Sequence, residues 1–359
     1  MSRTCIHVSN AADGDITTYT MQADGALLPG ARVRVADAVG PMAVSPDRRF
    51  LYAAVRSKPF SLHAHAIDPG TGALTPLSAS PLAESFPYIS LDKSGRYLLG
   101  ASYQAHLISV NAVGADGRVA AAPLQVIPVG RNAHSIRADE SNRFVYVPTL
   151  GSDQMFQFAF DANTGRLSSN TPAVVQMQPG TGPRHFVTSA DNRFLYLLSE
   201  LLATVTSFAL DANTGLLTEI GSASGLPPDT KLVPGTPRVA VGAASSAPPR
   251  NRDRDIWAAD IHLTPDGKFL YISERTSSSL GAFSVHAQSG KLTYQGSTPT
   301  EAQPRGFAIA PNGRFLVACG EKSETISVYA IDEASGALAL LRKYPGGKGA
   351  NWVEIVSLA

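Results

Sequence analysis

The segment GPRHFVTSADNRFLYLLSE, residues 182–200, carries residues suited to acid–base chemistry at both of its ends. Arg184 and His185 stand near its start, and Glu200 closes it. A carboxylate or an imidazole can take a proton from water, and a guanidinium can hold an oxyanion or a carboxylate. Between these ends, two short apolar runs joined by the turn residues 189–193 predict a β-hairpin. Because the ends of an antiparallel hairpin lie side by side, we expect Arg184, His185 and Glu200 to share one edge.

The same hairpin recurs along the chain. The aromatic residue that opens its second strand returns at intervals of roughly 47 residues, with one longer interval. These aromatics are Phe50, Tyr97, Phe144, Phe194, Phe269 and Phe315. A second turn marker, such as Thr71-Gly72-Ala73-Leu74, follows each aromatic and occurs seven times in the chain. Each repeat thus predicts four antiparallel strands, and the sequence predicts an all-β, seven-bladed β-propeller.

The two markers also predict how the ring closes. Seven turn markers accompany only six aromatic hairpins, so one blade is split between the chain ends. Residues 5–8 form a strand that lacks its own inner neighbour, and residues 351–356 would supply it, so that no edge stays unpaired. We therefore expect residues 1–359 to form a single propeller domain. Residues 222–255, rich in Pro, Gly, Ala and Ser, predict a long loop inserted between blades. The sequence leaves open whether this loop is a lid over the site or a surface excursion.

The repeat register places polar residues at equivalent positions of several blades. At the start of the innermost strand stand His134, Arg184, His185, Asp260 and Arg305, with Tyr88 as a weaker member; at the end of the adjacent strand stand Arg56, Tyr103, Glu200, Arg275 and Glu321. Both sets belong to one rim of the propeller. Because cations and histidines outnumber carboxylates there, the sequence predicts an anion-binding pocket at the mouth of the central channel.

Composition argues against other classes of protein. A formal net charge of +1 offers no field to attract nucleic acid or an anionic membrane. Cys5 and Cys319 are the only cysteines, too few for a disulfide framework or a Cys-based zinc site. The N-terminus lacks the pattern of a signal peptide, and no apolar run is long enough to span a bilayer, so we expect a cytoplasmic protein. The G-x-S-x-G and H-E-x-x-H motifs are absent, and a rim this poor in carboxylates predicts that neither a metal nor another cofactor is used.

Three segments resemble the β-propeller 6-phosphogluconolactonases of bacteria. They are WAADIHLTPDGKFLYISERTSSSLGAFSV at 257–285, PTEAQPRGFAIAPNGRFLVACGEKSETISVY at 299–329 and GPRHF at 182–186. That family is similar in turn to the fungal 3-carboxy-cis,cis-muconate lactonising enzymes. The resemblance implies a metal-free seven-bladed propeller that hydrolyses 6-phospho-D-glucono-1,5-lactone in the pentose phosphate pathway. The family's motif positions correspond to His134, Arg184, Glu200 and Arg275. The loop at 222–255 departs from the family pattern.

Lactone hydrolysis assigns roles to three of these residues. The reaction needs a base for the attacking water, a stabilised oxyanion and a proton for the departing ring oxygen. We expect Glu200 to be the base and His134 its partner in proton transfer or carbonyl polarisation, although the reverse assignment is also open. Arg184 suits the oxyanion or a substrate carboxylate.

The other polar rim residues are expected to bind substrate. This set comprises Arg275, Arg305, His185, Arg56, Tyr103, Asp260, His262, Glu321 and Lys322. Arg275 and Arg305 are the first choices for a phosphate, with Arg56 and Lys322 behind them; the alternative is that both arginines form rim salt bridges of small value with nearby glutamates. The expected ligand is a small sugar lactone, phosphorylated, and the protein is expected to be a monomer or weak homodimer.

Two other functions fit the same sequence. One is a lactonase or cycloisomerase for an unphosphorylated or carboxylated lactone of the muconate type, whose carboxylate the same arginines would bind. The other is a non-enzymatic scaffold, because propellers often bind other proteins. The second alternative predicts exposed aromatic residues at the rim rather than a cluster of His, Arg and Glu.

Overall fold

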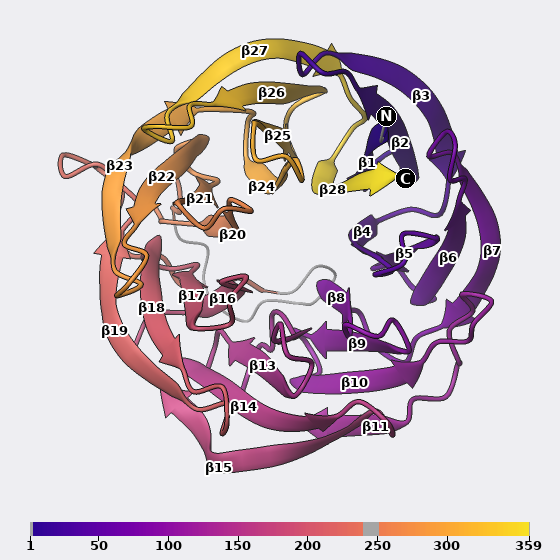
Figure 1. Cartoon of the computed structure of the whole chain (residues 1–359), viewed down its shortest axis with the longest axis horizontal. Coiled ribbons are helices and arrows are strands. Elements are labelled where there is room, and N and C mark those ends of the chain that lie inside the picture. Colours follow the sequence, from indigo (N-terminus) through magenta and orange to yellow (C-terminus); the bar gives the residue numbers. More distant parts are fainter. Residues whose placement is uncertain (1–2, 240–250, 359) are drawn as a thin grey trace.

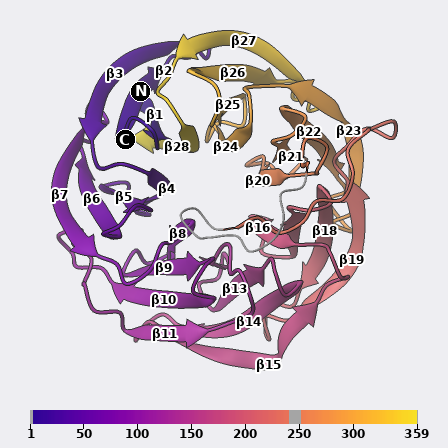
Figure 2. The ribbon, with the colours of Figure 1, turned by 180° about the vertical axis from the view of Figure 1, so that it is seen from behind.

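The computed structural model describes residues 3–239 and 251–358. Within these ranges the chain forms 28 β-strands arranged in seven four-stranded antiparallel sheets. The sheets stand like blades in a ring around a central axis, as Figure 1 shows, and the reverse view in Figure 2 shows the same ring. The predicted seven-bladed propeller is thus confirmed. The described part of the chain contains no helix with the length and apolarity needed to cross a membrane.

Each blade runs from an innermost strand at the channel to an outermost strand at the periphery. The blades, inner strand first, are β4 (Val39–Val44), β5 (Phe50–Val55), β6 (Ser61–Ile67), β7 (Leu74–Pro81); β8 (Tyr88–Leu91), β9 (Tyr97–Ser102), β10 (Leu107–Ala112), β11 (Gln125–Pro128); β12 (Arg137–Ala138), β13 (Phe144–Thr149), β14 (Gln154–Asp161), β15 (Arg166–Gln176); β16 (Pro183–Thr188), β17 (Phe194–Ser199), β18 (Thr204–Leu210), β19 (Leu217–Ser224); β20 (Ala258–Leu263), β21 (Phe269–Glu274), β22 (Ser279–Val285), β23 (Leu292–Pro299); and β24 (Pro304–Ile309), β25 (Phe315–Gly320), β26 (Thr325–Ile331), β27 (Leu338–Pro345).

The seventh blade joins the two ends of the chain. Its strands are, from the channel outwards, β28 (Ala350–Leu358), β1 (Arg3–Asn10), β2 (Asp15–Met21) and β3 (Leu27–Arg34). The pairing of β1 with β28 is antiparallel and matches Ile6 with Ile355. Figure 1 shows the first and last strands, β1 and β28, side by side in this blade. Closure by the terminal strands, predicted from the unequal number of markers, is therefore confirmed.

The two sequence markers recur because they touch each other across neighbouring blades. Gly165 of one turn marker has φ +71°, a backbone conformation that favours glycine, and a Cβ atom there would lie 2.4 Å from the ring of Tyr97 in the preceding blade. Gly215 is placed in the same way against Phe144. The glycine both permits the turn and makes room for the aromatic ring. The space between blades is filled by apolar clusters of the same kind, and the free thiols of Cys5 and Cys319 are buried in two of them.

The inserted loop begins after Ser224 and ends before Ala258, because residues 222–224 extend β19. Its described arms are pinned together: Val233 N donates to Arg254 O at 2.8 Å, and Ile256 N donates to Val233 O at 2.9 Å. Residues 240–250 lie outside the described ranges, and whether the insertion acts as a lid or is a surface excursion stays open.

Candidate active site

β-Bulges at the starts of the innermost strands place the charged residues. In the β16–β17 hairpin, Pro183 pairs with Ser199 and Phe186 with Leu197, so that Arg184 and His185 stand opposite a single residue. β20 has an equivalent bulge, which includes Asp260, and β24 has one at Arg305. A bulge adds a residue to one strand and redirects its side chains. Adjacent side chains, such as those of Arg184 and His185, can then point in directions that regular alternation along a strand would not give.

Glu200 is the centre of the site. Its Oε2 accepts hydrogen bonds from Arg184 Nε at 2.8 Å and from Arg275 Nη2 at 3.2 Å, and it lies 3.8 Å from Nε2 of His134. All four residues are buried, and Glu200 is only 4% exposed. Arg184 and Glu200 belong to one blade, and His134 and Arg275 to the two blades beside it, so the register brings His134, Arg184 and Glu200 together as predicted. What each of them does stays a prediction.

The site carries more positive than negative charge. Arg56, Arg184, Arg275 and Arg305 gather near two carboxylates, Glu200 and Glu321, and Arg305 lies 3.7 Å from Glu321. Burial lowers the pKa of Arg56, Arg184 and Arg275, and the charge of Arg305 lowers all three further. The buried Nε of Arg56 has no hydrogen-bond partner in the part of the chain that the structure describes. Because a guanidinium keeps its proton, such a cluster favours an anionic ligand.

His134 is an uncharged imidazole at neutral pH. Burial lowers its pKa well below the ordinary value, and the positive charge of Arg184 lowers it further. Its Nδ1 has no hydrogen-bond partner within the described residues. A neutral imidazole can accept a proton at one nitrogen and donate from the other, which suits it to proton transfer.

These side chains open into a small rim pocket of about 90 Å³. From the predicted set it is lined by Arg56, Tyr103, His134, Glu200, Arg275 and Arg305. The inserted loop adds Arg238, Val239 and Trp257, which the repeat register could not identify because they lie outside the repeats. The Trp257 ring lies between two guanidiniums, with Arg238 at 3.6 Å and Arg275 at 3.7 Å from its centroid. Part of the insertion therefore forms a wall of the rim pocket.

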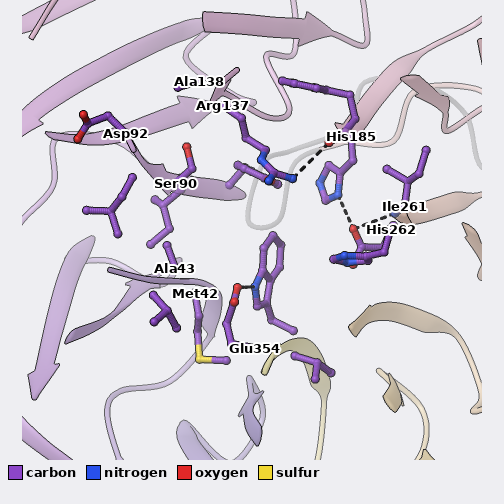
Figure 3. A pocket seen from close by; sticks show the side chains of 18 of the residues that line it. Met42, Ala43, Ser90, Asp92, Arg137, Ala138, His185, Ile261, His262 and Glu354 are labelled. Atoms are coloured by element: carbon purple, nitrogen blue, oxygen red, sulfur yellow. Dashed lines mark hydrogen bonds and ion pairs between the residues drawn. The ribbon is translucent and has the colours of Figure 1, made fainter. Parts of the chain in front are cut away.

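The structure divides the predicted rim set between two cavities. His185, Asp260 and His262 line a second, larger cavity of about 380 Å³ further along the channel, drawn in Figure 3. We call it the lower-channel cavity. Arg184 contacts Glu200 but lines neither the rim pocket nor the lower-channel cavity. Glu321 accepts a hydrogen bond from Gln303 at 2.7 Å beside the rim pocket, and Lys322 is exposed outside both.

His185 lines the lower-channel cavity and is hydrogen-bonded to Arg184, which holds Glu200 at the rim pocket. Arginine can only donate, so His185 Nε2, 3.0 Å from Arg184 Nη1, must accept. The ring proton is then on Nδ1 and is donated to Asp260 Oδ1 at 2.9 Å. Burial acts to raise the pKa of Asp260, but His262 and His185 lower it below the ordinary range, so the carboxylate stays charged. Asp260 therefore fixes the tautomer of His185, which in turn orients Arg184 against Glu200.

Sequence reasoning missed other residues of the lower-channel cavity. Arg137, Trp352 and Glu354 line it together with the weaker candidate Tyr88. Tyr88, His185 and Asp260 share one register position of their innermost strands, and Arg137 and His262 stand two residues further along. Because side chains alternate in a strand, those two positions face the same side. The alternation of side chains along the strand could therefore have identified Arg137 from the sequence. Trp352 and Glu354 could not be identified in this way, because they lie on β28, which has no aromatic marker.

The described residues contain no group of three or more His, Cys, Asp or Glu side chains placed to hold a metal ion. The donor set at Glu200 is one carboxylate and one imidazole among guanidiniums, which repel cations. Metal-independent chemistry stays a prediction.

The chain is similar over nearly its whole length to known proteins of the same fold. A family model described as lactonase, 7-bladed β-propeller, matches residues 5–355. The 6-phosphogluconolactonase of Serratia proteamaculans is 38% identical, over 98% of this chain and 98% of its own length. That of Pectobacterium carotovorum is 35% identical, with 98% of each chain covered. The periplasmic gluconolactonase of Pseudomonas aeruginosa, a solved structure, is 26% identical with a TM-score of 0.84, covering 100% of this chain and 99% of its own.

Fold and site together define a seven-bladed propeller enzyme with its polar residues at the mouth of the central channel. The family match extends over almost the whole chain. The chain belongs to the seven-bladed β-propeller lactonases and is a lactone hydrolase.

Proposed function

We propose that this protein hydrolyses 6-phospho-D-glucono-1,5-lactone to 6-phospho-D-gluconate, a step of the pentose phosphate pathway, without a metal. The observation that carries the proposal is the buried Glu200 carboxylate, which two guanidiniums hold beside a neutral imidazole, at a pocket that two further guanidiniums line. Two full-length relatives bear the name 6-phosphogluconolactonase. An excess of guanidinium charge suits a substrate with a phosphate group.

In the proposed mechanism Glu200 is the general base. Its Oε2 is held by Arg184 and Arg275, which leaves Oε1 to accept a proton from water. The water oxygen attacks the lactone carbonyl carbon, and the carbonyl oxygen takes the negative charge beside Arg275, which lines the rim pocket. The bond from this carbon to the ring oxygen then breaks. The proton held by Glu200 passes to the ring oxygen, with His134 as the relay, so that the carboxylate is regenerated.

Arg184 acts in this mechanism as a positioning residue. Its side chain lines neither cavity, unlike that of Arg275, and is bound to Glu200, to His185 and to the carbonyl of Ala259. It therefore orients the base rather than touching the substrate. Arg56 and Arg305 take the phosphate, because both line the rim pocket and Arg56 has a buried Nε without a partner among the described residues.

A second candidate substrate is an unphosphorylated sugar lactone, because the Pseudomonas aeruginosa structural relative is named a gluconolactonase. The two candidates are separated by kcat/KM on 6-phosphogluconolactone and on gluconolactone, each corrected for spontaneous hydrolysis. A charge-assisted phosphate contact predicts a preference of about tenfold to a hundredfold for the phosphorylated substrate. Arg305→Gln should reduce that preference. Equal kcat/KM values in the unaltered protein would remove the phosphate assignment, and loss of activity with EDTA would remove the metal-free mechanism.

The cytoplasmic location and the monomeric or weakly dimeric state remain predictions. One structural relative is named as periplasmic, so cell fractionation is the measurement that decides the compartment.

A further inference from the structure

The lower-channel cavity has the size of a ligand site. At about 380 Å³ it falls within the range of small-molecule pockets and is larger than the rim pocket. The rings of Tyr88, His185 and Trp352 pack edge to face between the two spaces, at centroid distances of 4.8 and 5.4 Å from Tyr88. At the other end the cavity reaches Pro46, which is exposed, and Lys93, whose side chain is 35% exposed. A small molecule can therefore enter from the face opposite the rim.

Most charged groups that line this cavity already have partners. Asp92 accepts hydrogen bonds from its own turn, among them Ser94 N at 3.0 Å and Tyr97 N at 2.9 Å. Lys93 pairs with Glu140 at 2.7 Å. Asp260 is bound by His185 and His262. None of these groups requires a ligand.

Arg137 is the exception among the cations. Figure 3 shows its side chain reaching from β12 into the cavity. Its Nη1 donates a long hydrogen bond to Phe186 O at 3.5 Å, and the Tyr88 side chain is its other hydrogen-bond partner. No carboxylate oxygen of the described residues lies within ion-pair distance of it, although the nearby charges of Glu140 and Glu354 help to raise its pKa. A guanidinium has five N–H donors, so these two partners leave donors for an anion that can accept two parallel hydrogen bonds.

Glu354 and Trp352 face the same space from the closing strand. Trp352 Nε1 donates to Glu354 Oε1 at 2.8 Å, which leaves Oε2 for another partner. Burial raises the pKa of Glu354 to about 7, so near neutral pH its carboxyl group can donate as well as accept. Such a group, together with His262, suits hydroxyl groups, and the indole gives an apolar wall for the C–H face of a ligand.

We propose that the lower-channel cavity is a second binding site, specific for a small polyhydroxy carboxylate. The carboxylate group binds Arg137, the hydroxyl groups bind Glu354 and His262, and the carbon chain lies against Trp352. This proposal does not rest on the substrate proposed for the rim pocket, since it uses none of the residues that line that pocket.

The two tryptophans of the chain allow the sites to be measured separately. Trp257 lines the rim pocket and Trp352 lines the lower-channel cavity. In a Trp257→Phe variant, tryptophan fluorescence reports only on Trp352. Titration of this variant with sodium gluconate should give a saturable change in fluorescence. D-Glucose lacks the carboxylate and inorganic phosphate lacks the hydroxyl-bearing carbon chain, so each should bind at least about tenfold more weakly. Calorimetry on the unaltered protein measures the same binding independently of fluorescence.

Matched variants in the Trp257→Phe background assign the binding to Arg137. Arg137→Gln should weaken gluconate binding at least about tenfold, whereas Glu200→Gln should leave it unchanged. Circular dichroism shows whether each variant is folded; if the Gln variant is not, Arg137→Lys keeps the charge but loses the paired donors and should also bind more weakly. Absence of saturable gluconate binding by both methods would overturn the proposal. So would binding that survives in a folded Arg137 variant, or binding that Glu200→Gln abolishes.

Discussion

At the scale of single residues, Glu200 is where side chains from different blades meet. Arg184 and Arg275 hold one of its oxygens, and His134 lies beside it. The distance of 3.8 Å from His134 Nε2 leaves the two groups close without a direct hydrogen bond. This arrangement keeps a charged base and a neutral imidazole next to the same small pocket.

Glu200→Gln should abolish most of the activity while the fold is retained. The amide has nearly the same shape but cannot take a proton, so kcat/KM should fall by about a hundredfold to ten-thousandfold. Glu321→Gln is the matched control, because Glu321 has the equivalent register position but binds Gln303 and Arg305. It should change kcat/KM much less. A Glu200→Gln variant with full activity would show that another group is the base.

Glu354 should make stability depend on pH. Its pKa is raised from 4.5 to about 7, chiefly by burial, so the folded state keeps a proton that the unfolded chain loses. The stabilising effect of the neutral carboxyl is complete below pH 4.5, declines as the pH rises from 4.5 to 7 and is lost above 7.

Glu354→Gln isolates this effect, because the amide does not titrate. Urea unfolding of the two proteins should show the free energy of unfolding of the unaltered protein falling relative to the variant between these pH values. Parallel pH profiles would contradict the assignment.

At the scale of strands and hairpins, the repeat predicted the blades but not the bulges. The aromatic and glycine markers can be read from sequence because contact across blades demands those residue types, as at Tyr97 and Gly165. The bulge at Arg184 and His185 depends on how β16 pairs with β17, which no local pattern encodes. The sequence could therefore identify which residues gather at the inner strands, but not that Arg184 turns to Glu200 while His185 lines the lower-channel cavity.

Gly306, next to the bulge at Arg305, should be intolerant of a side chain. A Cβ atom there would lie 2.8 Å from Asn351 O and 2.9 Å from Trp352 Cα, both in the backbone of β28, which cannot move aside easily. Gly306→Ala should lower the free energy of unfolding by about 1–3 kcal/mol. It should also reduce activity by shifting Arg305.

Gly70→Ala is the control for this substitution. A Cβ atom at Gly70 would meet only Asp68 Oδ1, at an ordinary 3.5 Å. Urea unfolding and kcat/KM of the two variants provide the comparison, and equal stabilities would show that β24 and β28 are not closely packed at this point.

At the scale of the whole molecule, closure of the ring by β28 completes the wall of the lower-channel cavity. The strand completes the blade that contains both ends of the chain, and it carries Trp352 and Glu354 to the channel. Asn351 ties it to the adjacent blade by donating from Nδ2 to Val39 O at 3.1 Å. Ring closure was predictable from the count of markers. The contribution of β28 to the channel was not, because it has no marker with which to align it.

Removal of residues 350–359 should prevent cooperative folding. The truncated chain would expose the inner edge of β1 and the apolar contacts made by Val353 and Val356, which are 4% exposed in the intact protein. Size-exclusion chromatography should show aggregation, and thermal unfolding should be broad. A synthetic peptide of residues 350–358 should restore part of the cooperativity. A monomeric truncated protein with an unchanged melting curve would show that closure does not stabilise the ring.

A crystal structure of the Glu200→Gln variant with 6-phosphogluconate tests most directly whether the rim pocket is the catalytic site. We expect the phosphate to contact Arg56 and Arg305, and the carboxylate carbon of the product to lie beside residue 200 and Arg275. A rim pocket left empty at saturating ligand, or a ligand bound there with its carboxylate far from residue 200, would contradict the assignment.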